Sequence, residues 1–317
     1  MIGLAAAGRS PAAQSPAAQS LAAQSPAAPE ADESVGGSAL EITSEPAHLV
    51  RGSLGRLLVH PAPGAAHIDS LTAMAAGEPL HFERRRDGSF AALVAAPIDD
   101  TDSASAALEV TLVAHRHRAG AATASSADTT VLALTLRDGN YRRERLTVAP
   151  QFARPDSAAA ARVADEVAEA HALGRNAHQT PRLWQRRFAA PRPGRVTSRF
   201  GTARELNGDV LTRHMGADFA GKVGAPVRAA NDGVVALVAK LYLAGNAVYI
   251  DHGGGLTTGY FHLSRAEVAA GDTVRRGQII GRVGRSGRAT GPHLHWIARY
   301  GEINVDPMSL LRLPPEP

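Results

Sequence analysis

Cysteine is absent from the 317-residue sequence, and aromatic residues make up only 4% of it. The lack of cysteine excludes disulfides and thiolate metal ligands, so a transition metal would have to be held by His, Asp or Glu. Lys222 and Lys240 are the only lysines, and the formal charge of +4 therefore comes from arginine. This charge suits an anionic envelope polymer or a nucleic acid. Because so few aromatic residues accompany the arginines, we expect no nucleic-acid partner.

Long hydrophobic runs are also missing. No stretch of about 18 apolar residues occurs, so we expect no integral membrane span. The opening MIGLAAAGRS is too short and too uncharged at its front for a complete secretory signal, although it fits the tail of one. A repeat of Ser, Ala, Gln and Pro follows and offers almost nothing to bury. Residues 1–40 are therefore expected to form a disordered low-complexity tether.

The rest of the chain has enough apolar residues for two domains, since hydrophobic content is 44%. Between residues 41 and 150, apolar and polar residues alternate in short runs separated by Gly, Asp or Pro. Five or more such runs predict a small antiparallel β-sandwich, with a hairpin turn at Arg85–Gly88. His115 and His117 in this region have no partner at metal-binding spacing, so we expect solvent-facing strand residues.

Residues 151–195 begin with a helical pattern. Asp156 or Ser157 can cap the start of this helix, and Gly174 is expected to end it. The apolar face is predicted to consist of alanines together with Val163, Val167 and Leu173. One connecting helix is therefore expected between two strand-rich regions.

Residues 176–195 contain three prolines and predict an inter-domain linker anchored by Trp184 and Phe188. From residue 196 to 313 the sequence is again rich in strand-like runs, with glycine in nearly every gap. These runs predict a second strand-rich domain, so the fold class is mainly β. His252, in YIDHGGGL, is expected to be a turn residue bonded to backbone.

Two short motifs in the second domain could hold a metal. In TGPHLHW, His293 and His295 would share one side of a strand, because side chains alternate faces. In RHMGADFAG, the setting is too glycine-rich for a helix, and a strand would place His214 and Asp218 on one face. Gly216 between them would clear space for an ion. A histidine, a carboxylate and a second histidine from a distant strand are the protein ligands of a catalytic zinc.

These motifs, with Y-x-H-L at Tyr260–Leu263, resemble those of the LytM or lysostaphin-type zinc endopeptidases, peptidase family M23. The phrases SRFG, GAPVRAANDGVV, VYIDHG, GRSGRATGPHLHW and NVDP agree and follow the family's order over about residues 195–311. The upstream strands and helix resemble the N-terminal β-domain of a Gram-negative subset. The resemblance implies that residues 196–313 form a LytM-like catalytic domain, an antiparallel sheet and barrel-sandwich hybrid.

The resemblance also implies roles for individual residues. The implied zinc ligands, for one Zn²⁺ per chain, are His214, Asp218 and His295. His262 and His293 would act beside the metal, one taking the proton from water and the other stabilising the oxyanion, in either order. Asn207 matches an asparagine that lines the cleft or, in latent members, takes the open zinc position, but it also suits a turn before Gly208. Tyr260 is expected to contact substrate.

The substrate implied by the family is the peptide part of bacterial cell-wall peptidoglycan. The partners would be its stem peptides, and the cleaved bond either a D-alanyl cross-link or a glycine bridge. The implied location is the cell envelope, periplasmic or secreted. The N-terminal β-domain would either cover the cleft within the same chain or hold the substrate.

Two other functions match parts of the sequence. The first is a catalytically inactive relative that binds the wall or regulates an amidase, although such members usually lose ligands and here all are present. The second is a carrier module, because VAAGDTVRRGQIIGRVG resembles the hammerhead of biotinyl and lipoyl domains. Those domains need a modified lysine at a hairpin tip, and neither Lys222 nor Lys240 lies in a matching motif.

Overall fold

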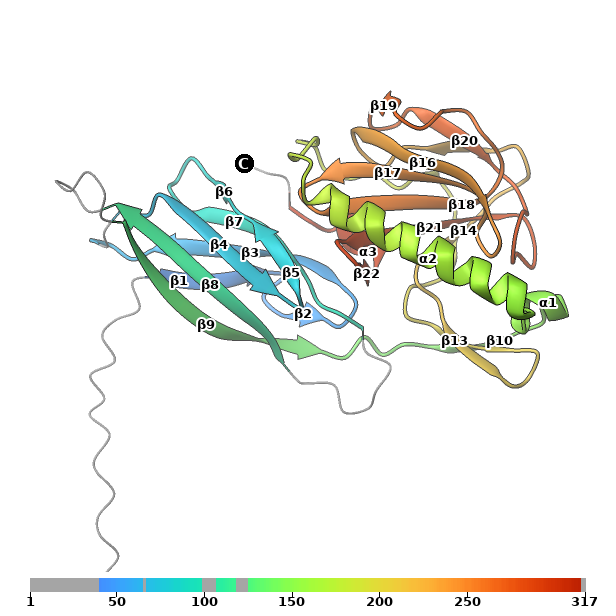
Figure 1. Cartoon of the computed structure of the whole chain (residues 1–317), viewed down its shortest axis with the longest axis horizontal. Helices are drawn as coiled ribbons and strands as arrows, with labels where there is room; N and C mark the ends of the chain where they lie inside the picture. Colours follow the sequence, from blue (N-terminus) through green and yellow to red (C-terminus); the bar gives the residue numbers. More distant parts are fainter. Residues whose placement is uncertain (1–39, 65–66, 99–106, 118–124, 315–317) are drawn as a thin grey trace, which may run out of the picture. The chain divides into compact units, whose positions relative to one another are not determined.

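Strands dominate the computed structural model, which describes residues 40–64, 67–98, 107–117 and 125–314 (Figure 1). The prediction of a mainly β fold with antiparallel sheets is confirmed. The predicted tether lies outside the described residues, apart from its last residue, Leu40, which begins the first strand. None of the helices in these ranges combines the length and apolar character required to span a bilayer.

Two sheets form the N-terminal β-sandwich. One contains, in order, β1 (Leu40–Glu45), β3 (Leu54–Pro61), β7 (Phe90–Ala95) and β6 (Glu83–Arg84). The other contains β2 (Leu49–Val50), β9 (Ser125–Arg137), β8 (Ala107–His117), β4 (Ser70–Ala75) and β5 (Glu78–His81). The pairs are antiparallel except for β2 with β9. Strand β4 alternates exposed and buried residues, and both sheets contribute to one apolar core.

Two local predictions in the sandwich can be compared with the structure. Gly88 has a φ of 83° and its N–H donates to Arg85 O at 3.1 Å, so the predicted hairpin turn is confirmed between β6 and β7. His115 and His117 both lie on β8, and His115 Nε2 is 3.3 Å from Thr72 Oγ1 on β4. His115 does not belong to the His-Asp-His group found among the described residues.

A larger sheet forms the C-terminal half. Its strands are β11 (Val196–Ser198), β14 (Ala217–Ala220), β15 (Pro226–Arg228), β16 (Gly233–Leu241), β17 (Gly245–Gly253), β18 (Leu256–Ala266), β19 (Thr273–Val274), β20 (Ile279–Val283), β21 (His293–Tyr300) and β22 (Ile303–Val305). The main path runs β11-β14-β21-β18-β17-β16-β19. Because β21 lies between β14 and β18, segments far apart in the sequence meet at this point.

Strand β10 (Arg143–Leu146) connects the two halves. It lies within the expected N-terminal domain of residues 41–150, yet it pairs in parallel with β12 (Ala203–Leu206), which pairs with β13 (Val210–Arg213). Apolar residues from both halves also belong to one buried cluster. The N-terminal region is therefore attached to the second domain by backbone pairing as well as by packing.

In the described ranges, three helices accompany the sheets: α1 (Pro150–Ala153), α2 (Ser157–Ala177) and α3 (Pro307–Leu310). Asp156 caps α2, as predicted, because its Oδ1 accepts a hydrogen bond of 2.8 Å from Ala159 N–H. Helix α2 packs on β17 and β18, the central strands of the large sheet (Figure 1).

The expectation that Gly174 ends this helix is wrong. The helix continues to Ala177, and Gly174 is buried where an added β-carbon would collide with Gly301 O. The predicted apolar face also needs correction, since Val167 is 49% exposed and the buried positions are Ala170, Gly174 and Ala177. Small residues face the sheet because the helix lies close to the turn at Gly301.

The predicted linker anchors are confirmed as core residues. Trp184 and Phe188 are buried, and their ring centroids lie 5.1 Å apart. Phe188 also meets the ring of His252 edge-on. His252 is not a turn residue: it lies on β17 with no exposed surface, and its Nδ1 bonds Asp232 O at 2.7 Å. The bond to backbone that was expected is present, but it joins distant segments inside the core.

Candidate metal centre

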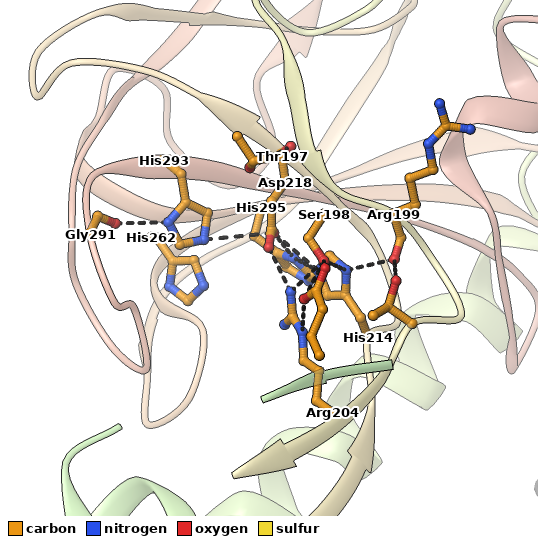
Figure 2. Close-up of polar contacts among 12 residues, drawn as sticks. Thr197, Ser198, Arg199, Arg204, His214, Asp218, His262, Gly291, His293 and His295 are labelled. Carbon is orange, nitrogen blue, oxygen red and sulfur yellow. Dashed lines mark hydrogen bonds and ion pairs between the residues drawn. The ribbon is translucent and has the colours of Figure 1, made fainter. Parts of the chain in front are cut away.

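Three of the predicted site residues converge on one point (Figure 2). His214 follows the end of β13, Asp218 lies on β14, and His295 lies opposite Asp218 in the antiparallel pair of β14 and β21. His214 Nε2 is 3.0 Å from Asp218 Oδ1 and 2.9 Å from His295 Nδ1, and His295 Nδ1 is 2.7 Å from Asp218 Oδ1. The three side chains form a candidate metal site.

The loop before β14 differs from the expected continuous strand. Strand β13 ends at Arg213 and β14 begins at Ala217, so Gly216 lies in the bend between them. A β-carbon on Gly216 would lie 2.6 Å from His295 Cε1 and 2.9 Å from its Nε2. The missing side chain therefore makes room for the ligand ring, and not for the ion itself as the sequence suggests.

The protonation of the three groups shows whether a cation fits. His214 Nδ1 is 2.9 Å from Arg199 O, and since a carbonyl only accepts, Nδ1 carries hydrogen and a neutral His214 presents an Nε2 lone pair. Burial favours the neutral form of Asp218, but the interactions with the neighbouring His214 and His295 side chains outweigh burial and hold the pKa of that carboxyl well below its usual range. Burial lowers the pKa of His295 to about 4.

With both imidazoles in their neutral form, the two ring nitrogens and the carboxylate oxygen that face one another carry at most one hydrogen between them. The lone pairs of these three atoms outnumber the hydrogens that could bridge them, so a cation suits the space between them. Two His nitrogens with one carboxylate oxygen match the ligand chemistry of zinc. The donor set fits a divalent zinc ion, as the sequence predicted.

Residues around the ligands orient them, and most were missed by the sequence reasoning. Arg204 donates from Nη2 to Asp218 Oδ2 at 2.8 Å and to Ser198 Oγ at 2.9 Å, which leaves Asp218 Oδ1 for the metal. Ser198 belongs to the SRFG phrase noted in the sequence, but no spacing pattern pointed to Arg204. The Arg199 carbonyl could not have been found, because backbone groups leave no mark on residue type.

His262 and His293 lie beside this cluster, as predicted. Their ring centroids are 4.8 Å apart, and His262 is 5.7 Å from His295 by the same measure. His262 Nδ1 is 2.8 Å from Ser286 O, and His293 Nδ1 is 2.8 Å from Gly291 O. Because both partners are carbonyls, each Nδ1 carries hydrogen and each Nε2 is left as an acceptor when the ring is neutral.

The backbone and surroundings of His262 are unusual. Its φ is 59°, a left-handed conformation rare for a residue with a side chain and often found at functional sites. Burial, followed by the charges of His295 and His293, lowers the pKa of His262 to about 3. His293 Nε2 lies 3.6 Å from Asp218 Oδ1, which places this ring next to the metal ligands.

Asn207 and Tyr260 lie elsewhere. Asn207 has a φ of 52° in the turn after β12, and its side-chain amide bonds both the N–H and the C=O of Val148, at 2.9 and 3.1 Å. Asn207 therefore matches the second interpretation given for it, a turn residue before Gly208, and not a residue that lines the cleft. Tyr260 has no exposed surface, and its hydroxyl accepts from Ala230 N–H at 2.8 Å in the core. Neither belongs to the described residues that line the cavity beside the metal ligands.

That cavity has a volume of about 410 Å³. Its wall includes Asp218, His262 and His293 on the metal side. The lining also includes, among other residues, a segment at and after β10 and two arginines. These further residues are Glu144, Leu146, Val148, Arg204 and Arg288.

Two histidines and an aspartate that meet on a β-sheet, with two more histidines beside them, form a ligand set of the kind found in catalytic zinc sites. The description that matches residues 212–307 is Peptidase family M23, and the chain carries a domain of this family. All three proposed ligands and both flanking histidines lie within the matched residues, whereas Asn207 does not.

Similar proteins come from several bacteria. The chain is 43% identical over 122 residues to the DD-carboxypeptidase/endopeptidase Mpg of Neisseria meningitidis, covering 38% of this chain and 28% of that protein. It is 47% identical over 94 residues to the peptidoglycan DD-endopeptidase ShyA of Vibrio cholerae, covering 29% and 22%. The matches thus span less than a third of these relatives. A crystal structure assigned to peptidase M23 from Pseudomonas aeruginosa has 26% identity and a TM-score of 0.59, covering 83% of this chain and 94% of that one.

Proposed function

We propose that the protein is a zinc-dependent endopeptidase that hydrolyses peptide cross-links of bacterial cell-wall peptidoglycan. The observation that carries this proposal is the convergence of His214, Asp218 and His295, with His262 and His293 beside them. One zinc ion per chain is proposed, because the described residues contain one such group. When bound, zinc would lower the pKa of a coordinated water and polarise the scissile carbonyl.

The protein's own groups supply the remaining chemistry. Ser286 O and Gly291 O fix the tautomers of His262 and His293, so each Nε2 can accept a proton or, once protonated, donate a hydrogen bond to an oxyanion. The neutral His262 ring has an Nε2 lone pair available, because its Nδ1 donates to Ser286 O. The two histidines are proposed to divide these roles between them.

The substrate class is proposed from the similar proteins and from the cavity. The relatives named as DD-endopeptidases support cleavage of a D,D-peptide bond in peptidoglycan, and action of this chain in the cell envelope. Two arginines, Arg204 and Arg288, line the cavity next to the ligands, which suits a substrate that carries negative charge.

An intramolecular cover is proposed for the cleft. Glu144, Leu146 and Val148 lie on or just after β10, which belongs to the N-terminal region, and they line the same cavity as the catalytic histidines. Pairing of β10 with β12 and the bonds from Asn207 to Val148 hold this segment in place. A long substrate would then have to displace part of it.

The function can be tested on purified peptidoglycan sacculi. The zinc-loaded full chain is expected to release cross-linked peptides as monomers, to lose this activity with a chelator, and to regain it with Zn²⁺. Metal analysis in parallel should give about one zinc per chain. Intact sacculi after incubation with protein that is folded and zinc-loaded would overturn the proposal.

A further inference from the structure

Two arginines line the cavity beside the metal ligands, but they are held differently. The Arg204 guanidinium is engaged by Asp218 Oδ2 and Ser198 Oγ. Arg288 is half-buried, and its backbone N–H donates to Leu243 O at 2.8 Å. No hydrogen bond or ion pair of the Arg288 guanidinium is found within the described part of the chain.

The acidic groups of the cavity do not compensate this charge. Both pair with Arg204 instead: Asp218 Oδ2 accepts from Arg204 Nη2 at 2.8 Å, and Glu144 Oε2 lies 3.6 Å from Arg204 Nε. Burial lowers the pKa of Arg288, and the positive charge of Arg204 lowers it further. A partly desolvated guanidinium without an anion is costly, so this arrangement favours an anion brought by a ligand.

The loop that carries Arg288 is rigid and linked to the reacting centre. Gly287 has a φ of 70°, and an added β-carbon would collide with the backbone nitrogen of Gly245. Ser286 O accepts the hydrogen bond from His262 Nδ1 at 2.8 Å. The same short segment thus orients a catalytic histidine and holds the arginine two residues further on, which sets the distance between them.

We propose that Arg288 binds a carboxylate of the substrate peptide and makes the enzyme prefer peptides with a free carboxylate near the scissile bond. The planar guanidinium can pair both of its outer N–H groups with the two oxygens of a carboxylate. The carboxylate is either the terminal α-carboxylate of the peptide or that of a side chain. This inference rests on the proposed function and adds the group by which substrate is selected.

The experiment compares three versions of one short stem-peptide substrate: all carboxylates free, the terminal carboxylate amidated, and the side-chain carboxylate amidated. The zinc-loaded full chain is assayed as wild type, Arg288→Gln and Arg285→Gln. Arg285 is the matched control, because it lies in the same loop, is exposed and does not line the cavity. Zinc content is measured for each protein.

Wild type is expected to lose roughly 10- to 100-fold in kcat/KM on one of the two amidated peptides, as for a lost charged hydrogen bond. The peptide affected identifies the source of the carboxylate. Arg288→Gln should lose a similar factor on the free peptide and show no preference among the three. Arg285→Gln should behave as wild type. Arg288→Lys should retain part of the preference, since it keeps the positive charge but lacks the planar pair of N–H groups.

Equal losses of Arg288→Gln on all three peptides, or no effect of amidation on wild type, would overturn the inference. Calorimetric binding of the same peptides separates its failure from that of the proposed function. Carboxylate-dependent binding that Arg288→Gln abolishes, without hydrolysis by wild type, would leave the inference standing and overturn the endopeptidase. Hydrolysis whose rate and substrate binding do not depend on the carboxylate would leave the endopeptidase standing and overturn the inference on Arg288.

Discussion

The ring of His295 lies against the backbone of Gly216, so closely that a β-carbon at position 216 would come within 2.6 Å of His295 Cε1. Gly216→Ala is therefore expected to displace this ligand and to weaken zinc binding about 10- to 100-fold, the range typical of groups that orient metal ligands. Competition with a chromogenic chelator measures the affinity. Gly291→Ala is the control, because an added carbon there meets no atom within 4 Å and zinc affinity should not change. Unchanged affinity in Gly216→Ala would show that the ring can move aside.

Ligands and catalytic groups should respond differently to truncation. His295→Ala removes one of three metal bonds and should lose most of its zinc along with its activity. His262→Ala and His293→Ala should keep near-stoichiometric zinc and lose activity by about 100- to 10,000-fold, as for general acid-base groups. Zinc content and sacculus hydrolysis are measured together, with His48→Ala, an exposed histidine, as the control. Full zinc in His295→Ala, or full activity in both other variants, would mean that the roles are wrong.

The proposed cover predicts that a substitution away from the metal raises activity. Asn207→Gly keeps the left-handed backbone but removes both side-chain bonds to Val148. Two lost hydrogen bonds of about 1 kcal/mol each would make opening of the segment roughly 10-fold or more frequent. Hydrolysis of sacculi should rise while zinc content stays constant.

The control for this test is Leu211→Ala, which alters a residue of the same hairpin that is 81% exposed. Reduced hydrolysis in Asn207→Gly with normal zinc would instead favour the role of Asn207 in the cleft. Equal hydrolysis in both variants and wild type would show that the segment does not limit access.

Gly174 offers a test in which steric conflict opposes helix propensity. Gly→Ala inside a helix normally stabilises by about 1 kcal/mol, but here the added carbon would collide with Gly301 O. We expect Gly174→Ala to lower the free energy of unfolding by about 1–3 kcal/mol. Val167→Ala, at a position on the same helix that is 49% exposed, should be neutral or slightly stabilising. Urea denaturation measures both, and a more stable Gly174→Ala would contradict the packing described.

Buried His252 predicts a dependence of stability on pH. Burial lowers the pKa of His252 from 6.5 to about 4, so between these values the unfolded chain binds more protons. The contribution to stability is complete above pH 6.5 and is lost as pH falls towards 4, by up to about 3 kcal/mol. His252→Gln should flatten the pH dependence of the unfolding free energy in this window, whereas His48→Gln should leave it unchanged. Parallel profiles for His252→Gln and wild type would refute this assignment.

Features with a regular local pattern were predictable from the sequence. Strand alternation placed His293 and His295 on one side, and the absence of cysteine restricted the metal ligands to His, Asp and Glu. The cap at Asp156 and the turn at Gly88 follow from local backbone chemistry, which depends only on a few neighbouring residues.

Tertiary structure alone decided the features that depend on distant partners. Gly174 matches a helix end in sequence and proved to be a contact with Gly301, and His252 resembles a turn residue but bonds Asp232 across the sheet. The hydrogen bonds from Arg204 to Asp218 and from His262 to the Ser286 carbonyl could not be predicted from the sequence. Each joins segments that only folding brings together. The sequence by itself determined which residues could hold a metal. Packing decided how those residues are oriented and which charge in the cavity lacks a partner among the residues that the structure describes.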